Sequence, residues 1–229
     1  MTIIQPRHIR SFVCRKGKKT SSQRLALENL WPRYGLSADV PLNRDAIFGR
    51  SAPTVLEIGF GDGKSLATMA ANAPEKDFIG IEVYENGIGR LLKSLEKMHL
   101  SNVRIFHHDA IEVLTKCIPD NSLETIQIFF ADPWPKSRHH KRRLIQTAFI
   151  DLVAKKLKKG GILHLATDWM DYAYQMMSVL SASDYFQNLT GEGQFAPRPS
   201  FRPLTKYEQR GLKLGHNTWD LLFQKEKKC

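Results

Sequence analysis

The chain has 229 residues, 42% of them hydrophobic and 25% charged, which is enough for a globular domain with a buried core. Its three cysteines lie far apart and form no C-x-x-C pair, so neither a disulfide framework nor a zinc site is supported. The formal net charge of +11 favours a polyanionic partner. Since no run approaches about 20 apolar residues and no secretory signal is recognisable, we expect a soluble, cytoplasmic protein.

Residues 1–27 form a basic arm that contains no acidic residue. Such an arm is either solvated and disordered or orders on phosphate groups. A second basic cluster after Trp134 has the same sign and favours phosphate binding. An irregular lead-in, punctuated by prolines, follows the arm. We therefore divide the chain into an arm with its lead-in over residues 1–50 and a single domain over residues 51–229.

Strand-like and helix-like segments alternate from Pro53 onward. Short apolar runs predict strands at 54–58, 78–81, 103–106, 126–130 and 162–166. Residues at helical spacing lie between them, and the helix after 126–130 is expected to be long, with its apolar face from Leu144 to Val153 and its end at Gly160-Gly161. A closing strand is predicted at 218–224. The alternation predicts a parallel sheet with helices on both faces and all ligand loops at one edge.

A glycine-rich turn, Glu57-Ile58-Gly59-Phe60-Gly61-Asp62-Gly63, follows the first predicted strand. Glycines at alternate positions permit a sharp turn and a close approach of the backbone to a ligand. The turn is not a P-loop, because Ile58 stands where that motif needs glycine, and it is one residue short of G-x-G-x-x-G. Taken alone, it is equally consistent with a structural turn and with a nucleoside site.

Two further acids end the next two predicted strands. Glu82 is placed to accept hydrogen bonds from both ribose hydroxyls, although a surface acid is the alternative. Asp109 is placed to accept from an adenine amino group, but with Glu112 it also forms a helix-capping pair. Together with Glu57, these acids predict a pocket for an adenosine group without a pyrophosphate clamp.

The run Asp132-Pro133-Trp134-Pro135 stops the fourth strand abruptly and leads into a basic cluster at 138–143. Asp132 and Trp134 should therefore lie on a stiff turn at the ligand-binding edge. Trp134 either stacks on an extruded base or packs in the core. The cluster is either the solvated polar face of the long helix or a phosphate-binding surface, and its place beside the site favours the latter. Its two histidines lack a spaced third ligand, so no metal is expected.

These motifs resemble the class I S-adenosylmethionine-dependent methyltransferases and, within them, the tRNA (guanine-N7-)-methyltransferase family. The resemblance is carried by Leu56-Glu57-Ile58-Gly59-Phe60-Gly61, Gly80-Ile81-Glu82, Ala131-Asp132-Pro133-Trp134-Pro135-Lys136, Lys141-Arg142-Arg143, Ala166-Thr167-Asp168-Trp169 and Thr205-Lys206-Tyr207-Glu208-Gln209-Arg210-Gly211. It implies a Rossmann-like, doubly wound, mostly parallel seven-stranded sheet with an antiparallel C-terminal strand. It also implies methyl transfer from S-adenosylmethionine to N7 of a guanine in the tRNA variable loop.

The resemblance also implies roles for individual residues. Contacts to the cofactor are expected from Glu57, Gly59, Gly61, Glu82, Asp109, Ala110 and Asp132. Contacts to the substrate guanine and its neighbours are expected from Lys136, Asp168, Thr205, Lys206, Tyr207 and Glu208. The RNA backbone is expected to meet Arg138, His139, His140, Lys141, Arg142 and Arg143. We expect tRNA as the partner, no membrane and no metal, and either a monomer or a homodimer.

Guanine N7 carries no proton, so its methylation needs no general base. Asp132, the catalytic candidate, is therefore interpreted as an orienting carboxylate that stabilises developing positive charge. Either Asp168 or Glu208 can accept from the N–H donors of the guanine Watson-Crick edge. The alternatives are a helix N-cap for Asp168 and a surface charge for Glu208. Two other functions stay open: a nicotinamide-dependent oxidoreductase and a catalytically silent RNA-binding subunit.

Overall fold

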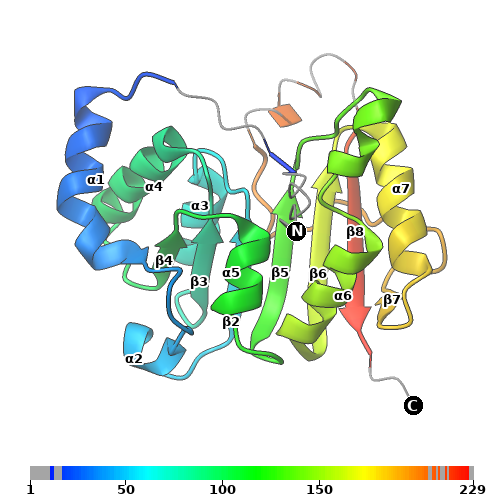
Figure 1. Ribbon diagram of the computed structural model, residues 1–229, viewed down its shortest axis with the longest axis horizontal. Helices are drawn as coiled ribbons and strands as arrows, with labels where there is room; N and C mark the ends of the chain where they lie inside the picture. The colour runs from blue at the N-terminus through cyan, green and yellow to red at the C-terminus, as the bar shows by residue number, and fades with distance from the viewer. Residues whose placement is uncertain are drawn as a thin grey trace, which may run out of the picture.

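The computed structural model describes residues 11–12, 17–205, 208–209, 211, 215 and 217–226. In this part of the chain, eight strands form one sheet in the order β1-β4-β3-β2-β5-β6-β8-β7 (Figure 1). The strands are β1 (Gly35–Leu36), β2 (Thr54–Ile58), β3 (Asp77–Ile81), β4 (Val103–Phe106), β5 (Leu123–Phe129), β6 (Leu157–Thr167), β7 (Phe186–Asn188) and β8 (Trp219–Lys225). The helices are α1 (Ser21–Tyr34), α2 (Arg44–Phe48), α3 (Lys64–Asn72), α4 (Glu85–Lys97), α5 (Ala110–Lys116), α6 (Thr147–Lys156) and α7 (Met170–Ser181), with a 3-10 helix η1 (Ser137–Arg142).

The sheet confirms the predicted fold class. β2 lies at its centre and pairs in parallel with β3 and β5, while β8 runs antiparallel to β6. The order reverses between β2 and β5, and ligands bind at the carboxyl edge beside such a switch point. The two-residue strand β1, which pairs with β4, adds an eighth strand to the expected seven.

Helices cover both faces of the sheet, as the β-α alternation predicts. On one face, α1, α3 and α4 pack against strand residues such as Val55, Phe78 and Ile105. On the other, α5, α6 and α7 pack against residues such as Leu56, Ile79 and Phe106. These residues alternate along β2, β3 and β4, as a period of two requires. Both layers fix the strand ends from which the site is built.

The end of the arm and part of the lead-in are regular, since α1, β1 and α2 lie between residues 21 and 48. Helix α1 packs on α4, and it begins with a capping box in which Thr20 and Gln23 bond each other's backbone N–H groups. Pro32 lies in the last turn of this helix. The basic side chains of residues 7, 10, 15 and 16 fall outside the described part of the chain.

The helix after β5 also differs from its prediction. Residues 137–142 form η1, and α6 starts only at Thr147, so the basic cluster is a separate 3-10 turn rather than the polar face of a long helix. Gly160 and Gly161 do not cap α6, which ends at Lys156. They lie within β6, where the register with β5 shifts and Gly160 has a φ of 77°.

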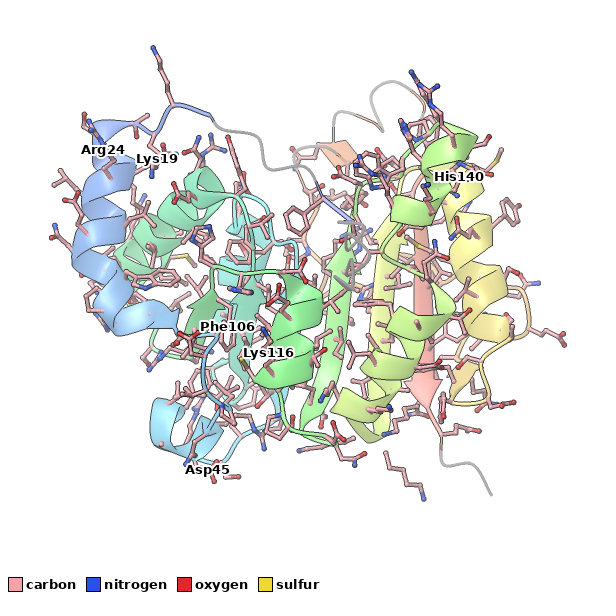
Figure 2. The ribbon with its side chains drawn as sticks, viewed as in Figure 1. Lys19, Arg24, Asp45, Phe106, Lys116 and His140 are labelled. Atoms are coloured by element: carbon pink, nitrogen blue, oxygen red, sulfur yellow. The ribbon has the colours of Figure 1, made fainter. Side chains whose placement is uncertain are left out.

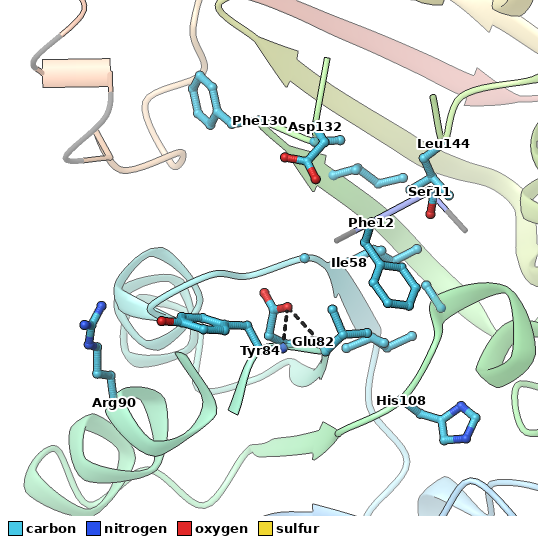
Figure 3. A pocket seen from close by; sticks show the side chains of 16 residues that line it. Ser11, Phe12, Ile58, Glu82, Tyr84, Arg90, His108, Phe130, Asp132 and Leu144 are labelled. Carbon is cyan, nitrogen blue, oxygen red and sulfur yellow. Dashed lines mark hydrogen bonds between the residues drawn. The ribbon is translucent and has the colours of Figure 1, made fainter. Parts of the chain in front are cut away.

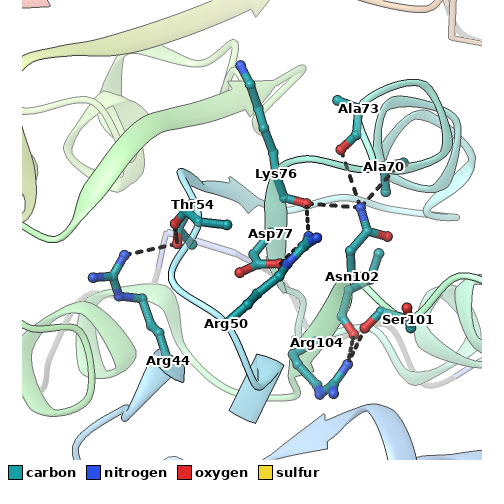
Figure 4. Close-up of polar contacts among 12 residues, drawn as sticks. Arg44, Arg50, Thr54, Ala70, Ala73, Lys76, Asp77, Ser101, Asn102 and Arg104 are labelled. Carbon is teal, nitrogen blue, oxygen red and sulfur yellow. Dashed lines mark hydrogen bonds and ion pairs between the residues drawn. The ribbon is translucent and has the colours of Figure 1, made fainter. Parts of the chain in front are cut away.

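A polar network closes the amino edge of the sheet, away from the predicted site (Figure 4). Arg50 donates from Nε and Nη2 to Oδ1 of the buried Asp77, over 2.9 and 2.7 Å. Asn102 donates to the carbonyl oxygens of Ala70 and Lys76, over 3.0 Å each. Side chains thus tie this edge of the sheet to the neighbouring loops. Separately, no described helix is both long and apolar enough to cross a membrane.

Candidate active site

A cavity of about 500 Å³ opens at the carboxyl edge of the sheet, between the ends of β2, β3 and β5. This volume suits a small-molecule cofactor. Figure 3 shows Asp132 on one side of the cavity and Glu82 with Tyr84 on the other. Of the predicted cofactor residues, the cavity is lined by Gly59, Glu82, Ala110 and Asp132.

The glycine turn presents bare backbone at the head of β2. Gly59 and Gly61 have φ values of 73° and 60°, and a Cβ on either would meet nothing within 4 Å. The turn is tied to β3 because the N–H of Gly59 donates to the carbonyl oxygen of Ile81 over 2.8 Å. A side chain at either position would be strained by the positive φ, and the space beside the backbone leaves room for a ligand.

Glu82 is held rigidly beside this turn. Its Oε2 accepts the N–H of Gly61 over 2.8 Å, and its Oε1 accepts those of Val83 and Tyr84 over 2.7 and 3.0 Å. Burial raises the pKa of Glu82, while these three bonds oppose the rise. Since each carboxylate oxygen can accept two bonds, Oε2 retains capacity for a ligand hydroxyl.

Glu57 lies near the same end of β2 but is not among the residues that line the cavity. The side chain is 3% exposed, and its Oε2 has no hydrogen-bond partner among the described residues. Burial raises the pKa of Glu57 to about 8, with the carboxylates of Glu82 and Asp62 acting in the same direction. Its surroundings therefore favour the neutral form of Glu57.

Asp109 has the helix-capping role that the sequence left open. Its Oδ1 accepts the N–H groups of Ile111 and Glu112 over 2.8 and 3.1 Å, at the start of α5. Its neighbours Ala110 and His108 line the cavity, whereas Asp109 does not. The predicted contact of Asp109 with the cofactor thus stays a prediction, and its geometric role is to place Ala110.

The turn after β5 is strained on both sides of Asp132. Phe130 and Trp134 have φ values of 57° and 45°, in the left-handed region that favours glycine. The N–H of Phe130 is nevertheless held by the carbonyl oxygen of Ala166 over 2.8 Å. Asp132 is therefore presented to the cavity, exposed, from a backbone that the sheet fixes.

Trp134 is half-buried, so it is not a core residue, and its ring already has contacts within the protein. Its Nε1 donates to the carbonyl oxygen of Ser11 over 3.0 Å, and the guanidinium of Arg142 lies 4.6 Å from its ring centroid. Ser11 and Phe12 both line the cavity. Sequence analysis missed these two residues, because nothing in the arm except its charge distinguishes them.

The basic 3-10 turn η1 begins directly after the Asp132 turn. Three cations at this turn are exposed: Lys136, Arg138 and Lys141. The rings of His139 and Trp134 pack edge to face, with their centroids 6.0 Å apart. The pKa of His139 is lowered by partial desolvation and by the surrounding cations. Among the described residues, no group of three or more His, Cys, Asp or Glu side chains is placed to hold a metal ion.

The structure gives Arg143 a different place from the one predicted. Its side chain is buried, and its guanidinium donates to Pro133 O over 2.8 Å and to the side chains of Gln175 and Asp171 on α7. His140 approaches the same Asp171 carboxylate, with Nε2 at 3.8 Å from Oδ2. Arg143 thus fastens the Asp132 turn to α7 and offers no free donor face to RNA.

Asp168 follows β6 at the same edge and is exposed. It is not the N-cap of α7: the cap residue is Trp169, whose N–H is bonded by the Thr167 hydroxyl over 3.2 Å. The capping alternative for Asp168 is therefore wrong, and its carboxylate stays available to a ligand.

Glu208 is buried rather than a surface charge, so that alternative is also wrong. Both carboxylate oxygens accept from Arg202, over 2.7 and 2.8 Å. Thr205 and Glu208 also form a capping box, in which the hydroxyl of Thr205 accepts the N–H of Glu208 over 3.1 Å. The T-x-x-E spacing carries this signal in the sequence. Lys206 and Tyr207, also predicted to meet the substrate, lie outside the described residues.

Several solved structures of similar fold are methyltransferases. The chain is similar to a 16S rRNA methyltransferase, with a TM-score of 0.59, 14% identity, and coverage of 82% of this chain and 99% of that one. It also matches a family described as "Putative methyltransferase" over residues 51–221. The sheet, the glycine turn and the strand-end acids thus define a Rossmann-like methyltransferase that uses S-adenosylmethionine.

Relatives of higher identity narrow this class. The chain is 57% identical over 220 residues to the tRNA (guanine-N(7)-)-methyltransferase of Alcanivorax borkumensis, covering 96% of this chain and 92% of that protein. The enzyme of the same name from Methylococcus capsulatus is 54% identical, with coverages of 96% and 95%. The chain therefore belongs to the tRNA (guanine-N7-)-methyltransferase family.

The residues at the cavity fit S-adenosylmethionine. Open space beside the backbone of Gly59 and Gly61 admits a ligand, and Glu82 keeps one acceptor site for a hydroxyl. The glycine turn need not clamp a pyrophosphate, which this cofactor lacks.

Proposed function

We propose that this enzyme methylates N7 of a guanine in the variable loop of tRNA. S-adenosylmethionine, held by the glycine turn, Glu82 and Ala110, supplies an electrophilic methyl group when bound. One observation carries the proposal: Glu82 and Asp132 face one cavity, and the exposed basic turn η1 begins five residues after Asp132. A nucleoside cofactor and a guanine within a polyanion can therefore meet at Asp132.

Asp132 acts by position and charge. Guanine N7 has a lone pair and no proton, so no group has to remove one. Positive charge passes to the guanine ring as the new bond forms, and a fixed carboxylate beside the ring stabilises it. The strained, sheet-bound turn keeps Asp132 in place before the substrate arrives, which favours an in-line arrangement of the reacting atoms.

Asp168 is the better candidate to read the guanine edge. It is exposed at the end of β6, next to the strand that carries Asp132. Glu208, by contrast, is 3% exposed, and both of its carboxylate oxygens accept hydrogen bonds from Arg202. A carboxylate that accepts from N1 and N2 of guanine discriminates against adenine, which presents an acceptor at N1. We therefore assign the base-reading role to Asp168 and a supporting role to Glu208.

The RNA backbone is proposed to meet η1 and its neighbour Lys136. The exposed cations are Lys136, Arg138 and Lys141, with Arg142 half-buried over Trp134 and His139 and His140 between them. Arg143 is left out of this surface because its guanidinium is used inside the protein. Phosphate contacts of this kind position the RNA without reading its sequence.

Incubation with labelled S-adenosylmethionine and bulk tRNA that lacks 7-methylguanosine tests the proposal. Nucleoside mapping should find 7-methylguanosine in the variable loop and in no other position. Label in another nucleoside would overturn the assigned base. Tight tRNA binding without binding of S-adenosylmethionine would favour a silent RNA-binding subunit, and calorimetric binding of NAD would favour an oxidoreductase.

We further propose that the enzyme works in the cytoplasm, where tRNA is modified and used, as a monomer or a homodimer. The buried, unpaired thiol of Cys117 supports a reducing compartment. Light scattering of the enzyme with and without tRNA distinguishes the two assembly states.

A further inference from the structure

A single guanidinium, that of Arg202, joins the C-terminal loop to the sheet. Arg202 is fully buried, although its loop has no regular structure before Thr205. It donates from Nε and Nη2 to the two oxygens of Asp220, over 2.8 Å each, and from Nη1 and Nη2 to those of Glu208, over 2.8 and 2.7 Å. Two bidentate forks of this kind fix orientation as well as distance.

The two carboxylates belong to different parts of the fold. Asp220 lies in β8, opposite Ala166 of β6, and it also accepts from Nε2 of the buried His164 over 2.7 Å. Glu208 lies in the C-terminal loop, where its N–H donates to the hydroxyl of Thr205. Arg202 therefore neutralises two acids that would otherwise repel each other in the interior. Burial opposes its charged form, but the hydrogen bonds to Glu208 and Asp220 outweigh this and raise its pKa.

The same guanidinium touches the strand end that carries Asp132. It lies 5.7 Å from the ring centroids of both Phe129 and Phe130, and Phe130 lines the cavity. Arg202 itself is not part of the cavity lining. Any influence it has on the reaction must therefore pass through the residues it holds.

We propose that Arg202 is a positioning residue, which sets the capped turn at Thr205 to Glu208 against the carboxyl end of β5 before tRNA binds. The inference deepens the proposed function and rests on it, because the supporting role assigned there to Glu208 requires this residue to be held in place. Lysine cannot replace this arginine, since an ammonium group retains the charge but cannot form two planar forks. The role thus depends on geometry and not on charge alone.

The variant Arg202→Lys, in the full chain, tests the role. We expect kcat/KM for tRNA to fall about 100-fold, as for a misplacement of about 1 Å at a reacting group, with the calorimetric affinity for S-adenosylmethionine unchanged. The matched control is Arg50→Lys, which alters a guanidinium paired with a buried carboxylate at the opposite edge of the sheet (Figure 4). It should retain wild-type turnover.

Hydrogen exchange supplies a readout that needs no tRNA. Segment 203–211 should exchange faster in Arg202→Lys, while β5, β6 and β8 keep their protection. If Arg202→Lys does not fold, Asp220→Asn replaces it, because this change removes the carboxylate charge on the sheet. The same fall in kcat/KM and the same faster exchange are then expected. Wild-type kcat/KM in the folded variant, or an equal loss of cofactor affinity, would overturn the inference. Absence of 7-methylguanosine with the unaltered enzyme would instead overturn the proposed function, while the exchange result would still test positioning.

Discussion

The two halves of the carboxyl edge hold their charges in opposite ways. At the ends of β2 and β3, the acids Glu57 and Glu82 are buried, and Glu82 is satisfied by backbone N–H groups. At the ends of β5 and β6, Asp132 and Asp168 are exposed, and the buried arginines nearby, Arg143 and Arg202, are each paired with carboxylates. We call these halves the glycine-turn side and the Asp132 side.

The contrast fits the two ligands proposed for the site. A small cofactor can be enclosed by the protein. The glycine-turn side can therefore carry buried hydrogen-bond acceptors that are already in position before the cofactor binds. A tRNA arrives as a large polyanion, so its side must present groups to solvent and support them from within. The predictions below test whether the two sides can be damaged separately.

The largest effect is expected from Asp132→Ala. Loss of a preorganised charge at the reacting centre should reduce kcat by roughly 100- to 1000-fold, with the fold and the cofactor site retained. Transfer of label to tRNA measures this loss. The control is Asp45→Ala, an exposed acid on α2, which Figure 2 places at the opposite end of the molecule from His140. Full activity of Asp132→Ala would remove this residue from the reaction.

Glu82→Gln should damage only the glycine-turn side. An amide has one oxygen, so it cannot serve N–H donors on both sides of the group. The ligand hydroxyl then loses its bond to a charged acceptor, which is worth about 2 kcal/mol, or roughly thirtyfold in affinity for S-adenosylmethionine. Calorimetry measures the loss, and Glu96→Gln, at an exposed pair with Arg33, is the control. An equal loss of tRNA affinity would mean that the two sides are not separable.

Lys141→Ala with Arg142→Ala should damage only the Asp132 side. We expect tRNA binding to weaken roughly tenfold and the slope of log affinity against log salt to decrease by about one for each phosphate that the enzyme no longer binds. Binding titrations at several salt concentrations measure both. The exposed pair Lys155 and Lys159, near the end of α6, is the matched control for the removal of two cations. An unchanged slope would move the RNA surface away from η1.

The smallest effect on turnover is expected from Glu57→Gln, which is visible mainly in stability. The folded-state pKa of Glu57, about 8, lies above its ordinary value of 4.5. The folded state therefore holds an extra proton between these values, and stability falls as pH rises through that window. The slope from this group is at most about 1.4 kcal/mol per pH unit.

Removing the carboxyl should flatten that part of the profile. Urea unfolding between pH 5 and pH 8 compares the variant with the parent and with Glu28→Gln, an exposed acid on α1. A profile of Glu57→Gln that still declines as steeply as the parent would show that Glu57 is not the group held neutral.

The features that could be predicted from the sequence are those that depend on residues close together in the chain. Apolar runs located β2 to β6 and β8, since a buried strand needs apolar side chains along its own length. The places of Glu82 and Asp132 followed from the ends of those strands. Two helix starts were also readable but were missed: Thr20 with Gln23, and Thr205 with Glu208, both at capping-box spacing.

The buried arginines could not be predicted in the same way. Arg143 and Arg202 belong to basic or irregular segments, where exposure is the usual state of an arginine. Their partners Asp171 and Asp220 lie in later elements, 28 and 18 residues along the chain. Only the folded sheet brings these charges together, so no local pattern records them.

The left-handed backbone at Phe130 and Trp134 bears on how such an enzyme evolves. Each conformation costs the fold about 1–3 kcal/mol, which glycine would avoid at these positions. Selection for heat resistance alone would therefore favour glycine beside Asp132 and would erode the rate of methyl transfer. The two aromatic residues thus place a stability cost at a known point in the chain, directly beside the residue proposed to act in methyl transfer.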